Sequence, residues 1–108
     1  MIEPRLTREA EADLDELWAF IAADSPEAAD RMVDAVLKSS RLYVGFPNMG
    51  QNRDDLREGI RCFVVSPYVI FYRPIEETIE VLRILHGARD VLPLIEDWPI
   101  KLERCEDS

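Results

Sequence analysis

The stretch GIRCFVVSPYVIFYRPIEETIEVLRILHGARD, residues 59–90, decides the fold of this 108-residue chain. It holds three runs rich in β-branched and aromatic residues, which are typical of strands. The runs are 60–66, 68–73 and 78–85. The short segments between them, Ser66-Pro67 and residues 74–77, carry proline and favour turns. This order predicts a three-strand antiparallel meander.

Upstream of the meander, the apolar periodicity changes to spacings of three and four, which predict two amphipathic helices. The first would begin after Thr7 as N-cap, with its acids on solvated faces. Its apolar stripe, with Trp18 expected in the core, is Ala10, Leu14, Leu17, Trp18 and Ile21. Ser25 and Pro26 suit the N-cap and first position of the second helix, while Asp24 with Glu27 would make an alternative capping box. The stripe of the second helix is Ala29, Met32, Val33, Val36 and Leu37.

Two further elements are expected near the ends of the chain. Residues 2–7 are a candidate strand, and Pro4 suits an edge position. The apolar run at 91–95, interrupted by Pro93, predicts a short last helix. The predicted fold is therefore α+β, in the order β-α-α-β-β-β, with a helix hairpin packed on a small antiparallel sheet. We expect one domain over residues 1–98 and a short charged tail at 99–108.

Composition limits the compartment and the chemistry. No run of 18 apolar residues occurs and the first residues lack a signal-peptide pattern, so we expect no membrane association and a cytoplasmic location. Cys62 and Cys105 stand far apart and are expected to be free thiols. No cysteine or histidine has a partner at ligand spacing, so neither a metal nor a cofactor is expected.

The net charge of −9, from 22 acids and 13 bases, disfavours binding of polyanions by the whole surface. We therefore expect no direct DNA binding by this protein alone. Several of the bases fall between residues 53 and 89, within or near the predicted sheet. The candidate functional residues of this region are Arg61, Arg73, Arg83, His86 and Arg89.

Strand alternation assigns two of these arginines to apolar faces. Arg61 would share a face with Phe63 and Val65. Arg83 would share one with Ile79, Val81 and Leu85. An arginine among apolar residues is either ion-paired or directed into a groove. For Arg83 we favour an ion pair with an acid of the first helix, with Glu80 as the other possible partner.

Several motifs, in order, resemble the ParE/RelE superfamily of toxins from type II toxin–antitoxin systems, and the ParE branch most closely. The closing run Arg83-Ile84-Leu85-His86-Gly87-Ala88-Arg89-Asp90 is the strongest. Other matching motifs are Gly59-Ile60-Arg61, Ile70-Phe71-Tyr72-Arg73, Pro47-Asn48-Met49-Gly50, the first-helix residues Ala10, Glu11, Asp13, Leu14 and Trp18, and Ser25-Pro26-Glu27-Ala28-Ala29. The resemblance covers residues 4–95.

This resemblance implies one fold with two functional classes, so the function must be argued from the site. RelE-like members cleave mRNA on the ribosome, whereas ParE-like members poison DNA gyrase by binding. Arg61 and Arg89 match arginines of the cleaving type, and His86 is a possible acid or base. However, residues 52–58 read NRDDLRE, without the lysines of cleaving members, and their late tyrosine is absent after Asp90.

The resemblance therefore favours a gyrase inhibitor that causes growth arrest and stabilises a plasmid or chromosomal locus. A ribosome-dependent mRNA endoribonuclease, with Arg61, His86 and Arg89 as its candidate catalytic residues, remains the alternative. A non-toxic relative that only binds an antitoxin is a third possibility.

The resemblance also implies a cognate antitoxin, ParD-like or similar, as the partner. An amphipathic antitoxin segment would lie in a groove between the helix hairpin and the sheet, or add as a strand at a sheet edge. Its carboxylates would pair with Arg61, Arg73, Arg83 and Arg89. Trp98 is a candidate anchor, and residues 89–98 are the expected contact with the target.

Overall fold

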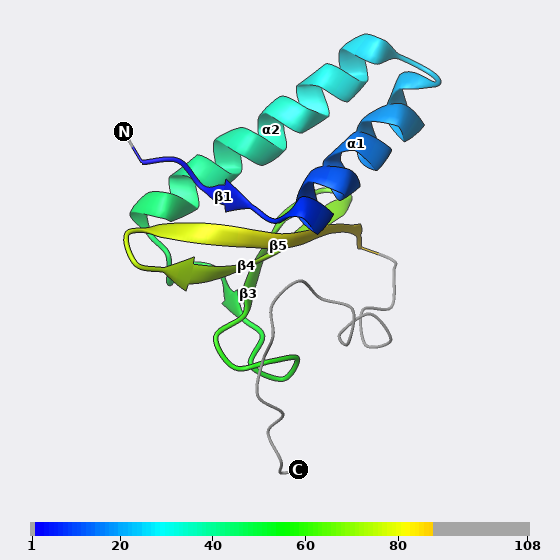
Figure 1. Cartoon of the computed structure of the whole chain (residues 1–108). Helices are drawn as coiled ribbons and strands as arrows, with labels where there is room; N and C mark the ends of the chain where they lie inside the picture. The colour runs from blue at the N-terminus through cyan, green and yellow to red at the C-terminus, as the bar shows by residue number, and fades with distance from the viewer. Residues whose placement is uncertain (1, 88–108) are drawn as a thin grey trace.

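The computed structural model of the chain describes residues 2–87, which form two helices over one face of a five-stranded sheet (Figure 1). The elements are β1 (Arg5–Leu6), α1 (Arg8–Ala22), α2 (Pro26–Gly45), β2 (Gln51–Asn52), β3 (Arg61–Val65), β4 (Tyr68–Ile75) and β5 (Thr78–His86). This confirms the α+β fold and the predicted meander, and adds β2, a two-residue strand without its own sequence pattern. The helix expected at 91–95 lies outside the described residues.

The strands lie in the order β1-β5-β4-β3-β2. The pairs β2–β3, β3–β4 and β4–β5 are antiparallel, and only β1 runs parallel, to β5. The expected edge position of the first strand is thereby confirmed. Among residues 2–87, no helix is long and apolar enough to cross a membrane.

Both helices begin at the predicted caps. The Thr7 hydroxyl accepts a hydrogen bond from the Ala10 amide at 3.0 Å, and the Ser25 hydroxyl accepts one from the Ala28 amide at 3.1 Å. Pro26 occupies the start of α2, where its missing N–H costs nothing. Ser25, rather than Asp24, is therefore the N-cap of α2.

Two apolar clusters hold the sheet. The first joins the helices to the sheet and contains Ala10, Leu17, Val36, Phe63, Tyr68, Ile70, Tyr72, Ile79, Val81 and Ile84. The second contains Leu56, Ile60, Cys62, Phe71, Leu82 and Leu85. Strands β4 and β5 contribute to both clusters, since successive side chains of a strand point to opposite faces.

A β-bulge in β5 changes which of its side chains share a face of the sheet. Tyr72 pairs with Val81, whereas Phe71 pairs with Arg83, so Leu82 is an extra residue in β5. An inserted residue reverses the alternation beyond it. Ile79 and Val81 therefore belong to the first cluster and Leu85 to the second, and the prediction that all three share a face with Arg83 is wrong.

The predicted turn at 74–77 is also too long. Strand β4 continues to Ile75, and only Glu76 and Glu77 form the loop, with φ of +37° at Glu76. Pro74 is tolerated inside β4 because the pairing with β3 ends at Tyr72. Its missing N–H therefore faces a side of β4 on which no described strand lies.

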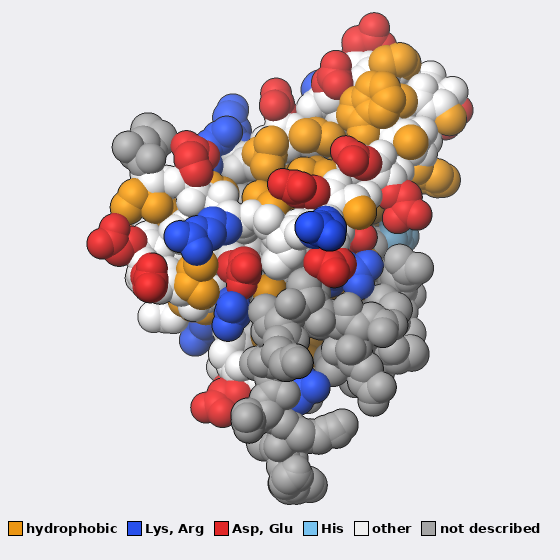
Figure 2. Space-filling view, in the orientation of Figure 1, with side chains coloured by type: hydrophobic (Ala, Val, Ile, Leu, Met, Phe, Trp, Pro, Cys, Tyr) orange, Lys and Arg blue, Asp and Glu red, His pale blue; other side chains and the backbone are white. Residues whose placement is uncertain are grey.

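The placement of two α1 side chains differs from expectation. Trp18 is 39% exposed and donates its indole N–H to Asp30 on α2 at 2.9 Å, so it is not a core residue. Conversely, Asp13 is buried, although the acidic side chains of this helix were expected on its solvated faces. Figure 2 shows hydrophobic side chains reaching the surface along the hairpin, with acidic side chains beside them. The apolar stripe of α1 is thus narrower than its sequence indicates.

Candidate functional site

The loop that follows α2 is fastened to the sheet from two sides. The Tyr72 hydroxyl donates to the Pro47 carbonyl at 2.7 Å and accepts from the Gly50 amide at 3.0 Å. The Arg61 Nη1 donates to the carbonyls of Asn48 at 3.0 Å and of Gly50 at 2.7 Å. Burial raises the pKa of the Tyr72 phenol, which therefore stays a donor near neutral pH. These bonds hold the loop in one conformation.

Arg61 also lines an open hollow of about 450 Å³ at this end of the sheet. The other lining residues are Asn48, Asn52, Asp54, Glu58, Gly59, Arg73 and Pro74. Arg61 forms no ion pair within residues 2–87, so its charge is open to a ligand. Asp54 and Glu58 line the same hollow. Their negative charges oppose the positive charge that is needed to stabilise the transition state of phosphate-ester cleavage.

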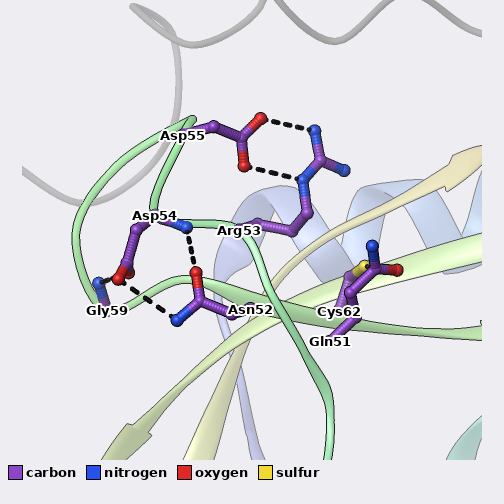
Figure 3. A network of polar contacts seen from close by, with 7 residues as sticks. All are labelled: Gln51, Asn52, Arg53, Asp54, Asp55, Gly59 and Cys62. Carbon is purple, nitrogen blue, oxygen red and sulfur yellow. Dashed lines mark hydrogen bonds and ion pairs between the residues drawn. The ribbon is translucent and has the colours of Figure 1, made fainter.

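The segment before Gly59 is a closed polar turn (Figure 3). Asp54 accepts hydrogen bonds from the Gly59 amide at 2.8 Å and from the Asn52 side chain at 3.1 Å. Arg53 binds both carboxylate oxygens of Asp55, each at 3.0 Å. The Gly59 amide lowers the pKa of Asp54, and the Arg53 guanidinium lowers that of Asp55. Both acids therefore stay ionised and build the turn.

Two of the predicted partner-binding arginines are already paired. Arg73 binds Glu80 through Nε and Nη2, each at 2.9 Å. Arg83 binds Asp13 with both nitrogens of its fork, at 2.8 and 3.1 Å, and the expected pair with an acid of the first helix is confirmed. Both arginines are therefore held by carboxylates of the chain itself.

His86 lies at the other end of the sheet. It pairs with Tyr68 in the strand register, and the two rings meet edge to face at 5.6 Å between centroids. Arg61 pairs with Tyr72, four residues further along β4, which corresponds to about 13 Å. His86 lines a separate groove of about 280 Å³ with Asp13, Glu16, Leu17, Phe20, Tyr68, Ile84 and Leu85. The described residues therefore do not bring Arg61 and His86 into one catalytic centre.

The remaining predicted site residues, Arg89 and Trp98, and the expected target segment 89–98 lie outside the described residues. Within residues 2–87, no three histidine, cysteine, aspartate or glutamate side chains gather in a way that could hold a metal ion. Cys62 is buried and free, and burial raises the pKa of its thiol. That thiol is thus a poor nucleophile near neutral pH.

Sequence reasoning missed two residues that organise this region. Tyr72 stood out in the sequence only as part of a motif, although a tyrosine in a buried strand needs a partner for its hydroxyl. Asp13 was assigned to solvent, although it lies three positions after Ala10 and four before Leu17, on the buried side of α1. That spacing was the available signal.

The family model of the ParE toxin of type II toxin-antitoxin system, parDE, matches residues 5–91, from β1 to beyond β5. The chain belongs to the ParE toxin family. The predicted resemblance is thereby confirmed, and this ParE-family chain is a toxin of a type II toxin–antitoxin system.

Individual relatives agree with the family. Toxin ParE1 of Caulobacter vibrioides is 35% identical over 88 residues, which cover 78% of this chain and 88% of the relative. Toxin ParE3 of the same organism is 32% identical over 86 residues, covering 79% and 86%. Toxin RelE3, also from that organism, is 28% identical over 79 residues, covering 72% and 86%.

A solved structure also shares the fold. A chain of the chromosomal ParDE TA system from P. aeruginosa superimposes with a TM-score of 0.66 and 26% identity. The match covers 80% of this ParE-family chain and 96% of that chain. The helix hairpin and sheet described above are therefore an architecture that the family shares.

Proposed function

We propose that this ParE-family toxin inhibits DNA gyrase by binding it, in the cytoplasm, and is neutralised by a cognate ParD-like antitoxin. The observation that carries the proposal is the aspartate-closed turn before Gly59. A cleaving relative would need lysines there, beside Arg61, and this chain instead places Asp54 and Glu58 in the same hollow.

The distribution of acid–base groups supports binding rather than cleavage. Attack by a ribose 2′-hydroxyl requires a base close to the groups that stabilise the transition state. His86 lies about 13 Å along the strand from the level of Arg61. The net charge of −9 also disfavours a position among ribosomal RNA phosphates, whereas a protein target tolerates it.

The antitoxin part of the proposal is supported by the family and by the similar solved structure, which is that of a ParDE system. Arg61, whose charge has no ion-pair partner within residues 2–87, is the sheet arginine best suited to meet an antitoxin carboxylate. Arg73 and Arg83 would first have to leave Glu80 and Asp13.

The test is supercoiling of relaxed plasmid by purified gyrase, with and without micromolar antitoxin-free toxin. We expect supercoiling to fall, and to recover when the product of the adjacent reading frame is added. Expression without that product should induce a DNA damage response.

Unchanged supercoiling together with codon-positioned mRNA cuts on ribosomes, lost in Arg61→Ala or His86→Ala, would instead identify a ribosome-dependent endoribonuclease. The absence of any growth arrest would identify a non-toxic antitoxin-binding relative.

A further inference from the structure

The longest stretch of this acidic protein without an acid lies in and after the second helix. Although 22 of 108 residues are aspartate or glutamate, none occurs between Asp34 and Asp54. This stretch includes the C-terminal half of α2 and the loop fastened by Tyr72 and Arg61. The stretch itself therefore contributes only positive charge, from Lys38, Arg41 and Arg53, in contrast to the acids along α1.

Four side chains define what we call the α2 C-terminal face: Lys38, Arg41, Leu42 and Phe46. Lys38 and Leu42 are four residues apart, so they lie on one side of the helix, and Phe46 is its C-cap residue. Leu42 is 53% exposed and Phe46 59% exposed, both large values for apolar side chains. The face thus combines two bases with two exposed apolar groups.

The base under this face is rigid. The Phe46 amide donates to the Tyr43 carbonyl at 3.2 Å, and the Tyr43 ring stacks on Phe63 at 4.1 Å between centroids. The exposed Met49 continues the apolar surface beyond the helix, and its amide donates to the Phe46 carbonyl at 3.0 Å. Because these bonds fix the backbone at Phe46 and Met49, little backbone conformational entropy is lost when a partner covers their side chains.

The bases of the face, like Arg61, are more available than three of the sheet and loop arginines. The sheet and loop arginines Arg53, Arg73 and Arg83 are bound to Asp55, Glu80 and Asp13. Lys38 has no ion pair within residues 2–87. Arg41 contacts Glu3 at 3.1 Å, but the two side chains are 46% and 56% exposed, and such a surface pair exchanges at small cost.

We propose that the α2 C-terminal face docks an acidic amphipathic segment of the antitoxin, whose apolar side chains cover Leu42 and Phe46 while its carboxylates meet Lys38 and Arg41. The inference rests on the proposed function in taking the antitoxin as the partner, and it adds an acidic contact on α2 to the one proposed for Arg61. A nucleic acid fits this face less well, because two of its four side chains are apolar and offer a phosphate chain no charge.

The experiment measures binding of the full-length toxin to the purified product of the adjacent reading frame, by titration calorimetry. The face variants are Lys38→Glu with Arg41→Glu, and Leu42→Ser with Phe46→Ser. Each has a control: Arg31→Glu, an exposed arginine nearer the start of α2, and Val64→Ser, an exposed apolar residue of β3. We expect Kd to rise about tenfold or more for both face variants and less than about twofold for the controls. Circular dichroism checks that every variant is folded.

The outcomes separate this inference from the function on which it rests. Wild-type toxin that does not bind the adjacent product contradicts the antitoxin part of the proposed function and this inference with it. Binding that the face variants retain, or that the controls lose equally, overturns the docking face alone. A labelled single-stranded oligonucleotide that binds wild type but not Lys38→Glu with Arg41→Glu, while the protein partner binds both, would make the face a nucleic-acid site. The gyrase measurement stands apart from all of these results.

Discussion

Among single residues, Asp13 connects the first helix to the last described strand. Strand β1 accompanies β5 only as far as Val81, so the β5 edge beyond it has no strand beside it among the described residues. Asp13 occupies that position. Its carboxylate accepts hydrogen bonds from the Ile84 amide at 2.9 Å and from Nε and Nη2 of Arg83. A helix carboxylate thus replaces the missing strand. The Ile84 amide, which would otherwise be an unpaired donor at this edge, is thereby satisfied.

Asp13→Ala tests this role. The substitution leaves a nearly buried Arg83 charge and the Ile84 amide without partners, so we expect the free energy of unfolding to fall by about 3 kcal/mol. Urea denaturation followed by circular dichroism measures the loss. The exposed Asp15→Ala on the same helix serves as control, with a change below about 0.5 kcal/mol. Equal effects of the two variants would contradict the assignment.

Tyr72→Phe isolates the hydroxyl that fastens the loop after α2. The variant keeps the ring in the core but removes the bonds to the Pro47 carbonyl and the Gly50 amide. We expect a loss of about 1–2 kcal/mol in urea denaturation and faster amide exchange at Gly50. Tyr43→Phe is the matched control, because its hydroxyl has no hydrogen bond within residues 2–87. A Gly50 amide that exchanges no faster than in wild type would disprove the role of Tyr72.

Among the elements, the turn between β2 and β3 is the one whose order depends on charge. It closes on the ionised carboxylate of Asp54 and includes Gly59 at φ of +89°, a backbone conformation that favours glycine. The strand β2, whose pairing with β3 precedes this turn, is only two residues long. Side-chain bonds therefore contribute more to the shape of this turn than strand pairing does.

The pH dependence of this turn follows from the direction of the Asp54 shift. The Gly59 amide stabilises the carboxylate, so the pKa of Asp54 in the folded protein lies below its ordinary value. The stabilisation is complete above the ordinary value of about 4 and is lost as pH falls through the lower folded pKa. An NMR titration of the Gly59 amide should show an inflection below pH 4 that disappears in Asp54→Asn. An inflection at or above the ordinary value would refute this account.

Across the whole molecule, β4 and β5 join the two apolar clusters into one cooperative unit. Ile70 and Leu82 are fully buried, one in each cluster. Because the same two strands supply both clusters, loss of packing on one face is transmitted to the other. The described domain should therefore unfold in a single step.

Ile70→Ala and Leu82→Ala test this unity from opposite faces. Each should lower the free energy of unfolding by about 2–5 kcal/mol, while Val64→Ala, at an exposed position of β3, should change it by less than about 0.5 kcal/mol. Far- and near-ultraviolet circular dichroism should report coincident transitions in both core variants. Separate transitions for the two signals would show that the clusters unfold independently.

The sequence by itself determined the class of the fold, the cap of the first helix, the meander and the family resemblance, and it left two candidate caps for the second helix. These depend on local patterns, namely capping hydroxyls at Thr7 and Ser25 and apolar periods of two or of three to four. It also disfavoured mRNA cleavage, because residues 52–58 lack the lysines that cleaving members carry there.

Only the tertiary structure decided which charges remain available. The sequence favoured a first-helix acid as the partner of Arg83, but only the packing decided that this acid is Asp13, 70 residues away. The extra residue at Leu82 reversed the expected faces of β5, since its presence is expressed only in the register with β4. Arg73 and Arg83 form ion pairs with carboxylates of the chain itself, while Arg61 lines an open hollow. Which charges find partners depends on contacts between elements distant in sequence, and packing alone determines those contacts.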